Sequence, residues 1–450
     1  MENWPEYLAG CERTGMPTAA IPCIFGVMIE FSAWPAPLSS AVSAEILLPG
    51  SKSLTNRELV LSALAEEPTE LISPLVSRDS ELMIASLKAL GTEFSWQGSD
   101  LLVTPGRLSG PAEIDCGLAG TVMRFVPPLS MLVNGKVSFD GDAGARTRPM
   151  KTTIESLRAL GAEVTSDTNS LPFTVNGTGS VVGGELTIDA SASSQFVSGL
   201  LLSAAKFDQG LTLTHKGQGL PSLPHIEMTL HTLRTRGVRA QAIDSSTWRV
   251  EPGPISGGRV VIEPDLSNAG PFLAAAMVTN GTVKIPNWPR ATTQVGDHYR
   301  TLLTRMGARI EVTDDVLTIS GSGRIMGIEA DLAEAGELTP TIAALCALAV
   351  SPSRLIGIGH LRGHETDRLA ALVAEINNLG GNAKELADGI EITPQPMRGG
   401  LWHTYHDHRM ATSGAIIGLA VSGIEVENIE TTAKTMPGFA KMWLDMLGSE

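Results

Sequence analysis

The sequence contains few cysteines, few aromatic residues and no long apolar run. Only four of its 450 residues are cysteines (Cys11, Cys23, Cys116 and Cys346). They lack the paired spacing of a zinc ribbon or a disulfide framework, so we expect reduced thiols and a cytoplasmic location. No apolar stretch approaches the ~18 residues of a membrane helix. Aromatic residues are 4% of the chain, so the core must consist mainly of Leu, Ile, Val, Ala and Met.

Basic residues are also in short supply. The chain has 33 Lys and Arg against 48 Asp and Glu, a net charge of −15. Binding to a nucleic acid needs a cationic face, so this balance argues against such a partner. The length suggests two or three domains. Residues 1–27 show no helical or strand period and resemble neither a secretory signal nor a transit peptide. We expect an N-terminal extension there, with Met28 as the natural start, or a loose tail.

Two interleaved series of positions recur along the chain. In the first, a helical pattern ends at a glycine, as a left-handed residue after a helix requires, and the glycines are 68 to 76 residues apart. In the second, a polar residue that could cap a helix precedes an apolar helical pattern, at spacings of 68 to 74 residues. The glycines are Gly91, Gly161, Gly237, Gly307, Gly380 and Gly448. The polar residues are Ser53, Thr121, Ser193, Ser267, Thr339 and Asp407.

The two series together predict six α/β units. Each unit has a strand, a buried helix, a strand, an amphipathic helix and a further strand. Three units should close around a shared core in each of two domains, which divide near residue 263. The predicted strands include 186–190, 211–217, 259–265, 282–288, 315–320 and 389–394. A strand at 45–49 precedes the first unit and could belong to either domain.

The starts of the apolar helices carry unusual residues. Arg and Lys at a helix start oppose the positive end of the helix dipole, and residues that break a local rule concentrate at functional sites. Helix N-termini combined with Lys and Arg form a site for phosphate or carboxylate groups. If all six starts face one cleft, the substrates should be small polyanions. These residues are Lys52, Ser53, Asn56, Arg57, Gly120, Thr121, Arg124, Ser193, Ser194, Gln195, Asp265, Ser267, Asn268, Glu337, Thr339, Asp407, His408 and Arg409.

Other motifs are weaker. The segment 49–53 lacks the glycines of a phosphate-binding P-loop, and 177–183 lacks the spacing of a dinucleotide-binding loop. On a helix that starts near Glu365, that residue and Arg368 would share one face, either as a surface ion pair or as a proton donor beside an anion-binding group. The histidines at 360, 364, 403, 406 and 408 do not have the pattern of a metal site, so we expect no metal. Cys116 fits a small buried residue better than a nucleophile.

Seven motifs in order resemble those of the 5-enolpyruvylshikimate-3-phosphate synthase family, from about Pro49 to the end of the chain. The motifs are PGSKSLTNR (49–57), GLAGTVMRF (117–125), RTRPM (146–150), SASSQF (191–196), HETDRL (364–369), YHDHRMA (405–411) and TTAKTMP (431–437). The resemblance implies an α/β enolpyruvyl transferase fold with two domains, each of three βαβαββ units with buried parallel helices. It assigns residues 50–263 to one domain and residues 28–49 with 264–450 to the other.

The resemblance also implies a reaction. The family transfers the enolpyruvyl group of phosphoenolpyruvate to the 5-hydroxyl of shikimate-3-phosphate and releases phosphate, through a non-covalent tetrahedral intermediate. This step belongs to chorismate and aromatic amino-acid biosynthesis and needs no cofactor. An acid, a base and fixed cations are what this chemistry requires. We expect a monomer that opens and closes, and competition between glyphosate and phosphoenolpyruvate near Gly120.

The site residues are carried over from the matching motifs. The catalytic residues would be Lys52, Glu337, Glu365 and His408. Shikimate-3-phosphate would be held by Lys52, Ser53, Arg57, Ser193, Ser194, Gln195, Ser222, Glu337, His360 and His364. Phosphoenolpyruvate would be held by Lys52, Gly120, Thr121, Arg124, Arg148, Gln195, Arg368, Arg409 and Lys434. Glu337 would deprotonate the hydroxyl, and Glu365 is implicated in protonating the methylene carbon.

The chain departs from the family pattern at four positions. It has His364 where many members have Lys, His225 where they have Tyr, and His360 and Leu118 where they have Asn. The histidines should make activity depend on pH. Three alternatives stay open: a UDP-N-acetylglucosamine enolpyruvyl transferase, whose cysteine loop is missing at 141–150; an RNA 3′-phosphate cyclase, which the net charge disfavours; and a non-catalytic anion-binding relative.

Overall fold

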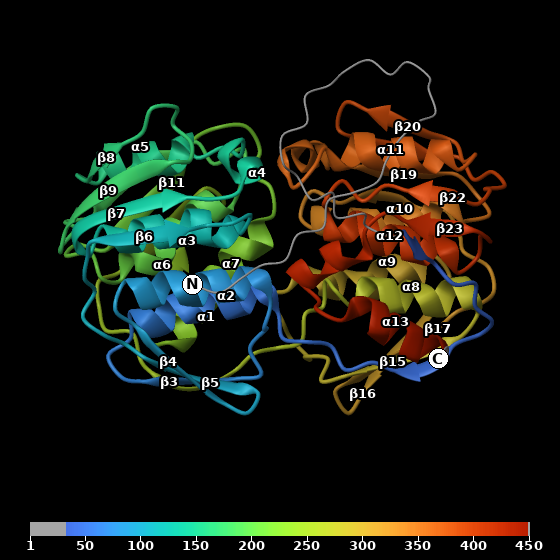
Figure 1. Ribbon diagram of the computed structural model, residues 1–450, viewed down its shortest axis with the longest axis horizontal. Helices are drawn as coiled ribbons and strands as arrows, with labels where there is room; N and C mark the ends of the chain where they lie inside the picture. The colour runs from blue at the N-terminus through green and yellow to red at the C-terminus, as the bar shows by residue number, and fades with distance from the viewer. Residues whose placement is uncertain (1–32, 449–450) are drawn as a thin grey trace, which may run out of the picture. The chain divides into compact units, whose positions relative to one another are not determined.

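The computed structural model describes residues 33–448, which form six small sheets around buried helices (Figure 1). The expected extension at 1–27 and residues 28–32 lie outside the described residues. Five sheets have four strands in one common order. At one edge of each sheet, two strands pair in parallel. The inner strand of this pair is also antiparallel to a third strand, which in turn pairs antiparallel with the fourth strand at the other edge. This repeated order is the structural form of the sequence repeat.

Three of the four-stranded sheets involve residues 69–261. The first contains β14 (Gly258–Val261), β3 (Thr69–Ile72), β5 (Asp100–Thr104) and β4 (Glu93–Gln97). The second contains β6 (Ala112–Asp115), β7 (Asn134–Asp140), β9 (Phe173–Thr178) and β8 (Glu163–Thr165). The third contains β10 (Gly184–Ile188), β11 (Leu211–His215), β13 (Thr247–Val250) and β12 (Ala240–Ala242).

The other three sheets involve residues 282–426, and two of them also include an N-terminal strand. One contains β16 (Arg309–Thr313), β17 (Val316–Ser320), β15 (Thr282–Pro286) and β2 (Ser43–Glu45). Another contains β18 (Glu329–Asp331), β19 (Ser353–Ile356), β21 (Gly389–Ile392) and β20 (Ala383–Leu386). The three-stranded sheet contains β1 (Trp34–Pro35), β23 (Ile424–Val426) and β22 (Gly400–Trp402).

Two of these sheets take their first strand from a distant part of the sequence. β2 pairs in parallel with β15, and β14 pairs in parallel with β3. The predicted strand at 45–49 is wrong in its bounds, because the pairing of β2 ends at Glu45 and Leu47 is 69% exposed. An apolar run alone indicated that strand, and part of the run has no partner to bury it.

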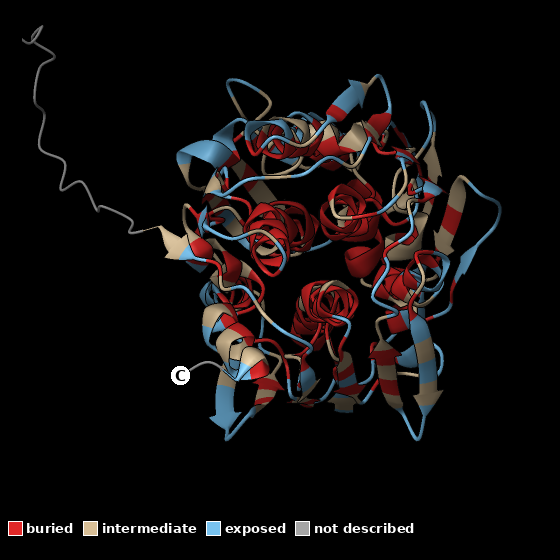
Figure 2. Ribbon diagram, turned by 90° about the vertical axis from the view of Figure 1, so that its right-hand side faces the viewer, coloured by how far each residue is buried: buried red, intermediate tan, exposed pale blue. Residues whose placement is uncertain are grey.

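Six helices are buried along nearly their whole length: α1 (Lys52–Ala63), α3 (Gly120–Ser130), α6 (Gln195–Ala204), α8 (Gly270–Thr279), α10 (Thr339–Ala347) and α12 (His408–Gly418). They are the apolar helices that the sequence predicts. Figure 2 shows buried helices seen end-on, surrounded by elements whose outer faces are exposed. The sheets therefore bury one face against helices and leave the other in water.

The outer helices have one apolar face. They are α2 (Arg78–Ala89), α5 (Lys151–Ala159), α7 (Leu223–Thr235), α9 (Tyr299–Arg305), α11 (Arg368–Asn378) and α13 (Phe439–Leu447). All six predicted glycines follow these helices with positive φ, from 67° at Gly448 to 108° at Gly91, which confirms that prediction. The short elements are α4 (Ala143–Arg146), η1 (Val295–His298), η2 (Gly336–Leu338), η3 (Gly359–Gly363) and η4 (Ile429–Lys434).

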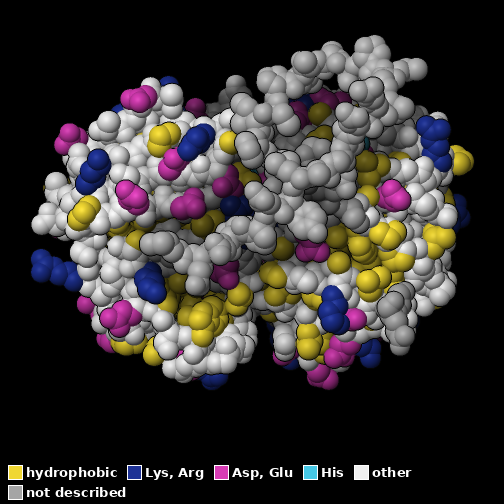
Figure 3. Space-filling view, in the orientation of Figure 1, with side chains coloured by type: hydrophobic (Ala, Val, Ile, Leu, Met, Phe, Trp, Pro, Cys, Tyr) yellow, Lys and Arg dark blue, Asp and Glu magenta, His cyan; other side chains and the backbone are white. Residues whose placement is uncertain are grey.

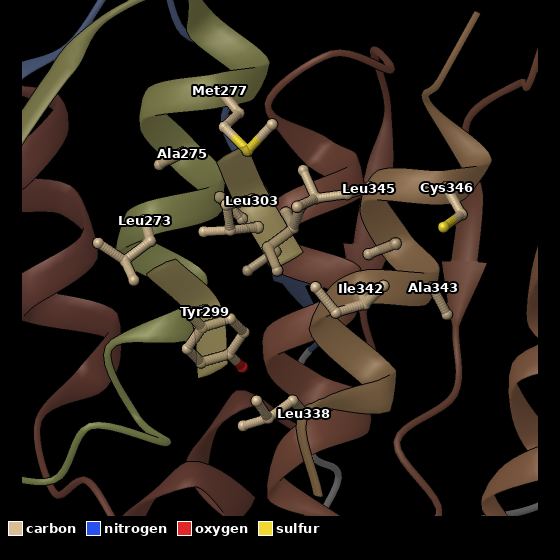
Figure 4. Packing of buried hydrophobic residues seen from close by; sticks show 14 of the residues in the cluster. Leu273, Ala275, Met277, Tyr299, Leu303, Leu338, Ile342, Ala343, Leu345 and Cys346 are labelled. Carbon is tan, nitrogen blue, oxygen red and sulfur yellow. The ribbon is translucent and has the colours of Figure 1, made fainter. Parts of the chain in front are cut away.

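The buried residues form two large clusters. One extends from Leu59 to Ile255; the other contains Ala36, Val42 and Ile46 and then nothing before Leu266. In the second cluster, side chains of α8, α9 and α10 interleave around Leu303 (Figure 4). As the composition predicts, aliphatic residues dominate both clusters. None of the helices in residues 33–448 is long and apolar enough to cross a membrane.

The predicted caps of the buried helices are mostly wrong. Asp407 caps its helix, by accepting a hydrogen bond from the N–H of Arg409 at 2.8 Å. Ser193 lies before α6, and its hydroxyl accepts from the N–H of Gln195, the first residue of that helix, at 3.2 Å. The other four polar residues lie inside the first turn, at the first position or before the helix: Ser53, Thr121, Thr339 and Ser267. α1 is capped by Ser51 instead, and α3, α8 and α10 have no side-chain cap. Their N-termini therefore keep N–H groups that a side chain would otherwise occupy.

Candidate functional site

The six buried helices begin at one cavity. Its lining includes residues from the start of every one of them, from Lys52 of α1 to Arg409 of α12. This arrangement confirms that the six helix starts share one cleft. The predicted site residues that line it are Lys52, Ser53, Thr121, Arg124, Arg148, Ser193, Ser194, Gln195, Ser222, Glu337, His360, His364, Glu365, Arg368, His408 and Arg409.

Three predicted residues are not part of the lining. The Arg57 guanidinium is buried and is held by Thr229 Oγ1 at 2.8 Å, by the Ser53 carbonyl and by the His225 carbonyl. Gly120 lies just behind the wall, and Lys434 reaches the cavity through Glu365, with their Nζ and Oε1 atoms 2.6 Å apart. Arg57 therefore lies in the wall behind the lining, close enough for the charge of Glu337 to raise its pKa against the larger lowering by burial.

The cavity is cationic within an acidic protein. Five Lys and Arg residues line it against three carboxylates, those of Asp265, Glu337 and Glu365, although the whole chain carries −15. On the face shown in Figure 3, acidic and basic side chains are interspersed and form no basic field. The positive charge is therefore concentrated inside, where it can bind a small anion and not a polymer.

Two of the arginines have no acidic partner among the described residues. Arg124 donates to the Pro149 carbonyl at 3.1 Å and Arg148 to the Leu118 carbonyl at 3.1 Å, and the Nε atom of each is buried without a partner. Burial, and then the neighbouring Arg148, lowers the pKa of Arg124 well below its usual value. Such groups favour a bound anion, which would supply the missing counter-charge.

Glu337 is a carboxylate held among cations. Its oxygens accept a hydrogen bond from the Ser267 hydroxyl and lie 3.8 Å from Arg409 and 3.7 Å from His225 Nε2. Burial raises its pKa, but Arg409, His225, Ser267 and Lys52 outweigh that effect and lower it to about 2. Glu337 is therefore ionised and available to accept a proton.

The second carboxylate is Glu365, which precedes α11. Its partners are Lys434 and the Arg368 guanidinium, whose Nη2 donates to Oε2 at 3.0 Å. Burial raises the pKa of Glu365, but the charges of Lys434, Arg368, His408 and Arg148 outweigh burial and lower this pKa well below its usual value. The helix predicted near Glu365 is wrong, since Asp367 is the cap of α11, but the predicted pairing is present. Arg368 is 2% exposed, which excludes a surface ion pair.

Four histidines line the cavity: His225, His360, His364 and His408. Burial is the largest cause that lowers the pKa of each one, and nearby arginines add to it. They are therefore neutral near pH 7. Protonation would become easier once anions bind beside them, because opposite charge favours the imidazolium.

Sequence reasoning missed several lining residues, among them Gln294. This buried side chain donates to Glu263 at 2.8 Å and to the Pro264 carbonyl at 2.9 Å, and it fixes the chain before Asp265. The Asp265 carboxylate accepts from the N–H groups of Lys52 and Asn268, both at 3.1 Å, so it ties two helix starts together. A lone glutamine in a loop gives no sequence signal.

The two cysteines within residues 33–448 and the remaining histidines are not part of the cavity lining. Cys116 and Cys346 are buried as free thiols, and burial is the main cause that raises the pKa of each to about 12, which leaves neither poised as a nucleophile. Cys11 and Cys23 lie outside the described residues. His403 and His406 lie outside the lining, and no three His, Cys, Asp or Glu side chains in residues 33–448 gather as metal ligands would.

The repeated units and their shared cationic cavity are those of one class, the enolpyruvyl transferase fold. Two solved structures of EPSP synthase from Acinetobacter baumannii share it, each with 23% sequence identity. Their TM-scores are 0.76 and 0.75; the matches cover 91% and 90% of this chain and 96% of each of those chains.

Sequence comparison narrows the class to a family. The model of the family described as EPSP synthase (3-phosphoshikimate 1-carboxyvinyltransferase) matches residues 38–443. A 3-phosphoshikimate 1-carboxyvinyltransferase of Kocuria rhizophila is 57% identical over 431 residues, which cover 93% of this chain and 97% of that protein. The chain belongs to the EPSP synthase family and is an enzyme of the transferase class.

Proposed function

We propose that the cavity is the active site at which this chain transfers the enolpyruvyl group of phosphoenolpyruvate to the 5-hydroxyl of shikimate-3-phosphate. One observation carries this proposal: a single cationic cavity holds two partly buried carboxylates, Glu337 and Glu365, in different surroundings. An addition followed by an elimination needs one group to accept a proton and another to deliver one. The remaining cations balance the phosphates and carboxylates of the two substrates.

In the addition step, Glu337 accepts the proton of the 5-hydroxyl. The oxygen of that hydroxyl bonds to C2 of phosphoenolpyruvate, and C3 gains a proton. A pKa of about 2 makes Glu337 a weak base in the empty cavity. Bound phosphate and carboxylate groups compensate Arg409 and Lys52 and raise that pKa toward a useful value. Substrate binding therefore activates the base.

The proton for C3 comes from the Glu365 and Lys434 pair, in which Lys434 Nζ donates a hydrogen bond to Glu365 Oε1 at 2.6 Å. In the elimination step C3 returns a proton to this pair, the bond from C2 to the phosphate oxygen breaks, and Glu337 gives its proton to the departing phosphate, which leaves the enol ether and restores both groups. His408 adjoins the pair and lowers the pKa of Glu365 when it is charged. No group of the protein becomes covalently attached.

The substrates divide between the sets of residues that the motifs indicate. Ser193, Ser194 and Gln195 at the start of α6, with Ser222 before α7, suit the shikimate phosphate, because hydroxyls and helix N–H groups bind such a group. Arg124 and Arg148, whose charges are unpaired, suit phosphoenolpyruvate. Lys52 lies between the two sets and would contact both substrates. His360 and His364 border the site for shikimate-3-phosphate.

Phosphate release tests the proposal. The purified protein should release phosphate only when both shikimate-3-phosphate and phosphoenolpyruvate are present, and mass spectrometry should show the enol ether product. Omission of either substrate is the control. Release with UDP-N-acetylglucosamine in place of shikimate-3-phosphate would assign the chain to the other enolpyruvyl transfer, and binding of both ligands without release would make it a non-catalytic binder.

The proposal also includes the domain organisation, the oligomeric state and the closure of the domains. Residues 50–263 form one domain and residues 28–49 with 264–450 the other, a division supported by the two buried clusters. The enzyme is a cytoplasmic monomer without a cofactor, and its domains close on shikimate-3-phosphate and exclude water. Small-angle scattering should show a smaller radius of gyration with the ligand; an unchanged radius would contradict closure.

A further inference from the structure

A buried carboxylate outside the cavity holds the turn that leads into α12. Glu375 lies in α11 and has no exposed surface. Its Oε1 accepts from the Tyr405 hydroxyl at 2.6 Å, and its Oε2 accepts from the backbone N–H of His403 at 2.9 Å. Within the described residues, no Lys, Arg or His forms an ion pair with it at 4.0 Å or less. The carboxylate of Glu375 is therefore satisfied by this turn.

The turn itself has an unfavourable backbone conformation. Tyr405 and His406 are consecutive non-glycine residues with φ of 52° and 55°. Each left-handed residue of this kind costs about 1–2 kcal/mol, so the conformation persists only where neighbouring groups impose it. One hydrogen bond to Glu375 comes from His403, two residues before this pair, and the other from Tyr405 within it. The intervening Thr404 donates its N–H to Glu427 at 2.9 Å, so both carboxylates hold the turn. These hydrogen bonds are contacts that impose the conformation.

The turn leads directly into the cap and the first residues of α12, which line the cavity or bind a residue that lines it. Asp407, the next residue, caps α12 and is fully buried, and its carboxylate binds Arg368 of the cavity at 2.7 Å and 3.2 Å. His408 and Arg409 follow and line the cavity. Arg368 and Glu375 are seven residues apart on α11, two turns on one face, so a single helix holds both ends of the turn.

We propose that Glu375 is a positioning residue for the transfer reaction: it fixes the left-handed turn at 405–406 so that Arg409 and His408 face the substrates. This inference rests on the proposed function. Arg409 belongs to the predicted site for phosphoenolpyruvate, whereas most predicted ligands of shikimate-3-phosphate lie on α1, α6 and α7 or directly before them. Loss of the carboxylate should therefore affect one substrate more than the other.

Glu375→Leu removes both hydrogen bonds and leaves no buried charge behind. We expect the KM for phosphoenolpyruvate to rise about tenfold or more, because small misplacements of a binding group have large effects, with little change in the KM for shikimate-3-phosphate. Glu375→Gln should lie between this variant and the unaltered enzyme, since its amide oxygen still accepts from His403. A purely structural role would reduce the active fraction, and thus kcat, while both KM values stayed unchanged.

A second change tests the link to the backbone. Glycine adopts positive φ without a steric cost, so His406→Gly should restore much of the KM for phosphoenolpyruvate in the Glu375→Leu background. His406→Gly alone should have nearly unaltered kinetics. Non-additivity of the two changes supports the proposal, and strict additivity overturns it.

The outcomes separate this inference from the proposed function. If Glu375→Leu fails to fold, as a thermal melt would show, Tyr405→Phe removes one of the two hydrogen bonds and should still raise the KM for phosphoenolpyruvate a few-fold. An unselective change in both KM values, or none, in the folded variant overturns the positioning role. No phosphate release by the unaltered protein would instead overturn the proposed function.

Discussion

The two walls of the cavity hold their cations in different ways. The first wall (residues 51–228 of the lining) presents Arg124 and Arg148, which have no carboxylate within 4.0 Å among the described residues. Lys52 of the same wall is the exception, because its Nζ lies 3.7 Å from the Asp79 carboxylate. The second wall (residues 265–435 of the lining, with Lys434 behind it) presents cations that are each paired with a carboxylate. These pairs are Arg368 with Asp407, Arg409 with Glu337 and Lys434 with Glu365.

This difference divides the work of the site. An unpaired guanidinium attracts an anion, whereas a paired one mainly sets the protonation of its partner. The first wall is therefore suited to bind, and the second contains the carboxylates that move protons beside cations that also bind phosphoenolpyruvate. Changes to the unpaired arginines of the first wall should alter KM, and changes to the carboxylates Glu337 and Glu365 of the second wall should alter kcat.

The largest expected effect is in the second wall. Glu337→Gln removes the proposed base while keeping its shape, and kcat should fall about 10²- to 10⁴-fold. Affinity for shikimate-3-phosphate, measured by calorimetry, should change far less. The matched control is Glu334→Gln, an exposed carboxylate three residues earlier in the same segment, and it should leave kcat intact. A fall of less than tenfold in Glu337→Gln would remove this residue from the proton transfer.

The first wall should respond in KM. Arg148→Ala removes an unpaired guanidinium, and the KM for phosphoenolpyruvate should rise about 10- to 100-fold, since hydrogen bonds to charged groups contribute about 1.5–3 kcal/mol. Arg146→Ala is the control, because that arginine is exposed and pairs with Asp140. If Arg148→Ala lowered kcat at saturating substrate and left KM alone, the division between the walls would be wrong.

The histidines make stability depend on pH. Burial and Arg368 lower the pKa of His364 in the folded protein, whereas an unfolded histidine binds a proton near pH 6.5. Neutral His364 therefore adds no cost to folding above pH 6.5. As the pH falls below this value, the unfolded state binds the proton more readily than the folded state, and the free energy of unfolding falls. His364→Gln should reduce this loss by about 1 kcal/mol per pH unit between pH 6 and 5.

Urea unfolding at several pH values measures the effect. Burial raises the pKa of Glu58 to about 7, which acts in the opposite direction, but that contribution is the same in both proteins and cancels in the comparison. The exposed His231 supplies the control substitution, His231→Gln, for which the slope should not change. Equal slopes for His364→Gln and the unaltered protein would contradict the prediction.

The smallest expected effect is that of an added methyl group at Gly120, beside the arginines of the first wall. A Cβ atom at Gly120 would lie 3.1 Å from Arg148 Nη2, 3.1 Å from Gln195 Oε1 and 3.2 Å from Arg124 Nη1. These flexible groups can shift by a few tenths of an ångström, so we expect Gly120→Ala to raise the KM for phosphoenolpyruvate only a few-fold and to weaken glyphosate inhibition. Gly253→Ala, where no atom lies within 4 Å of the added carbon and φ is not positive, is a spatial control. An unchanged inhibition constant would exclude contact near Gly120.

The sequence predicted the repeated parts of this molecule well. The six glycines and the six apolar helices depend on local rules, the left-handed turn after a helix and the burial of an apolar surface. The convergence of the helix starts also followed from local rules, because Lys and Arg at a helix N-terminus need an anion.

Features that depend on distant partners could not be predicted in this way. The caps failed because Ser51 replaced Ser53 and several helices have no cap, which depends on the surrounding packing. The partners of β2 and β14 are far away in the sequence, so their local pattern could not identify the sheet to which each belongs. Gln294 and Glu375 act through hydrogen bonds across the fold and have no motif.

The pairing of β2 and β14 with strands far away in the sequence has a consequence for folding during translation. The sheet of β3 lacks its edge strand until residues 258–261 have left the ribosome, and β2 must wait for β15 at 282–286. The sheet of β3 therefore stays incomplete until almost all of residues 69–261 have been made, and the cluster that contains Val42 and Ile46 cannot form before residue 266 follows. A nascent chain that stops before Gly258 should leave β3 with an unpaired edge, open to aggregation or to a chaperone.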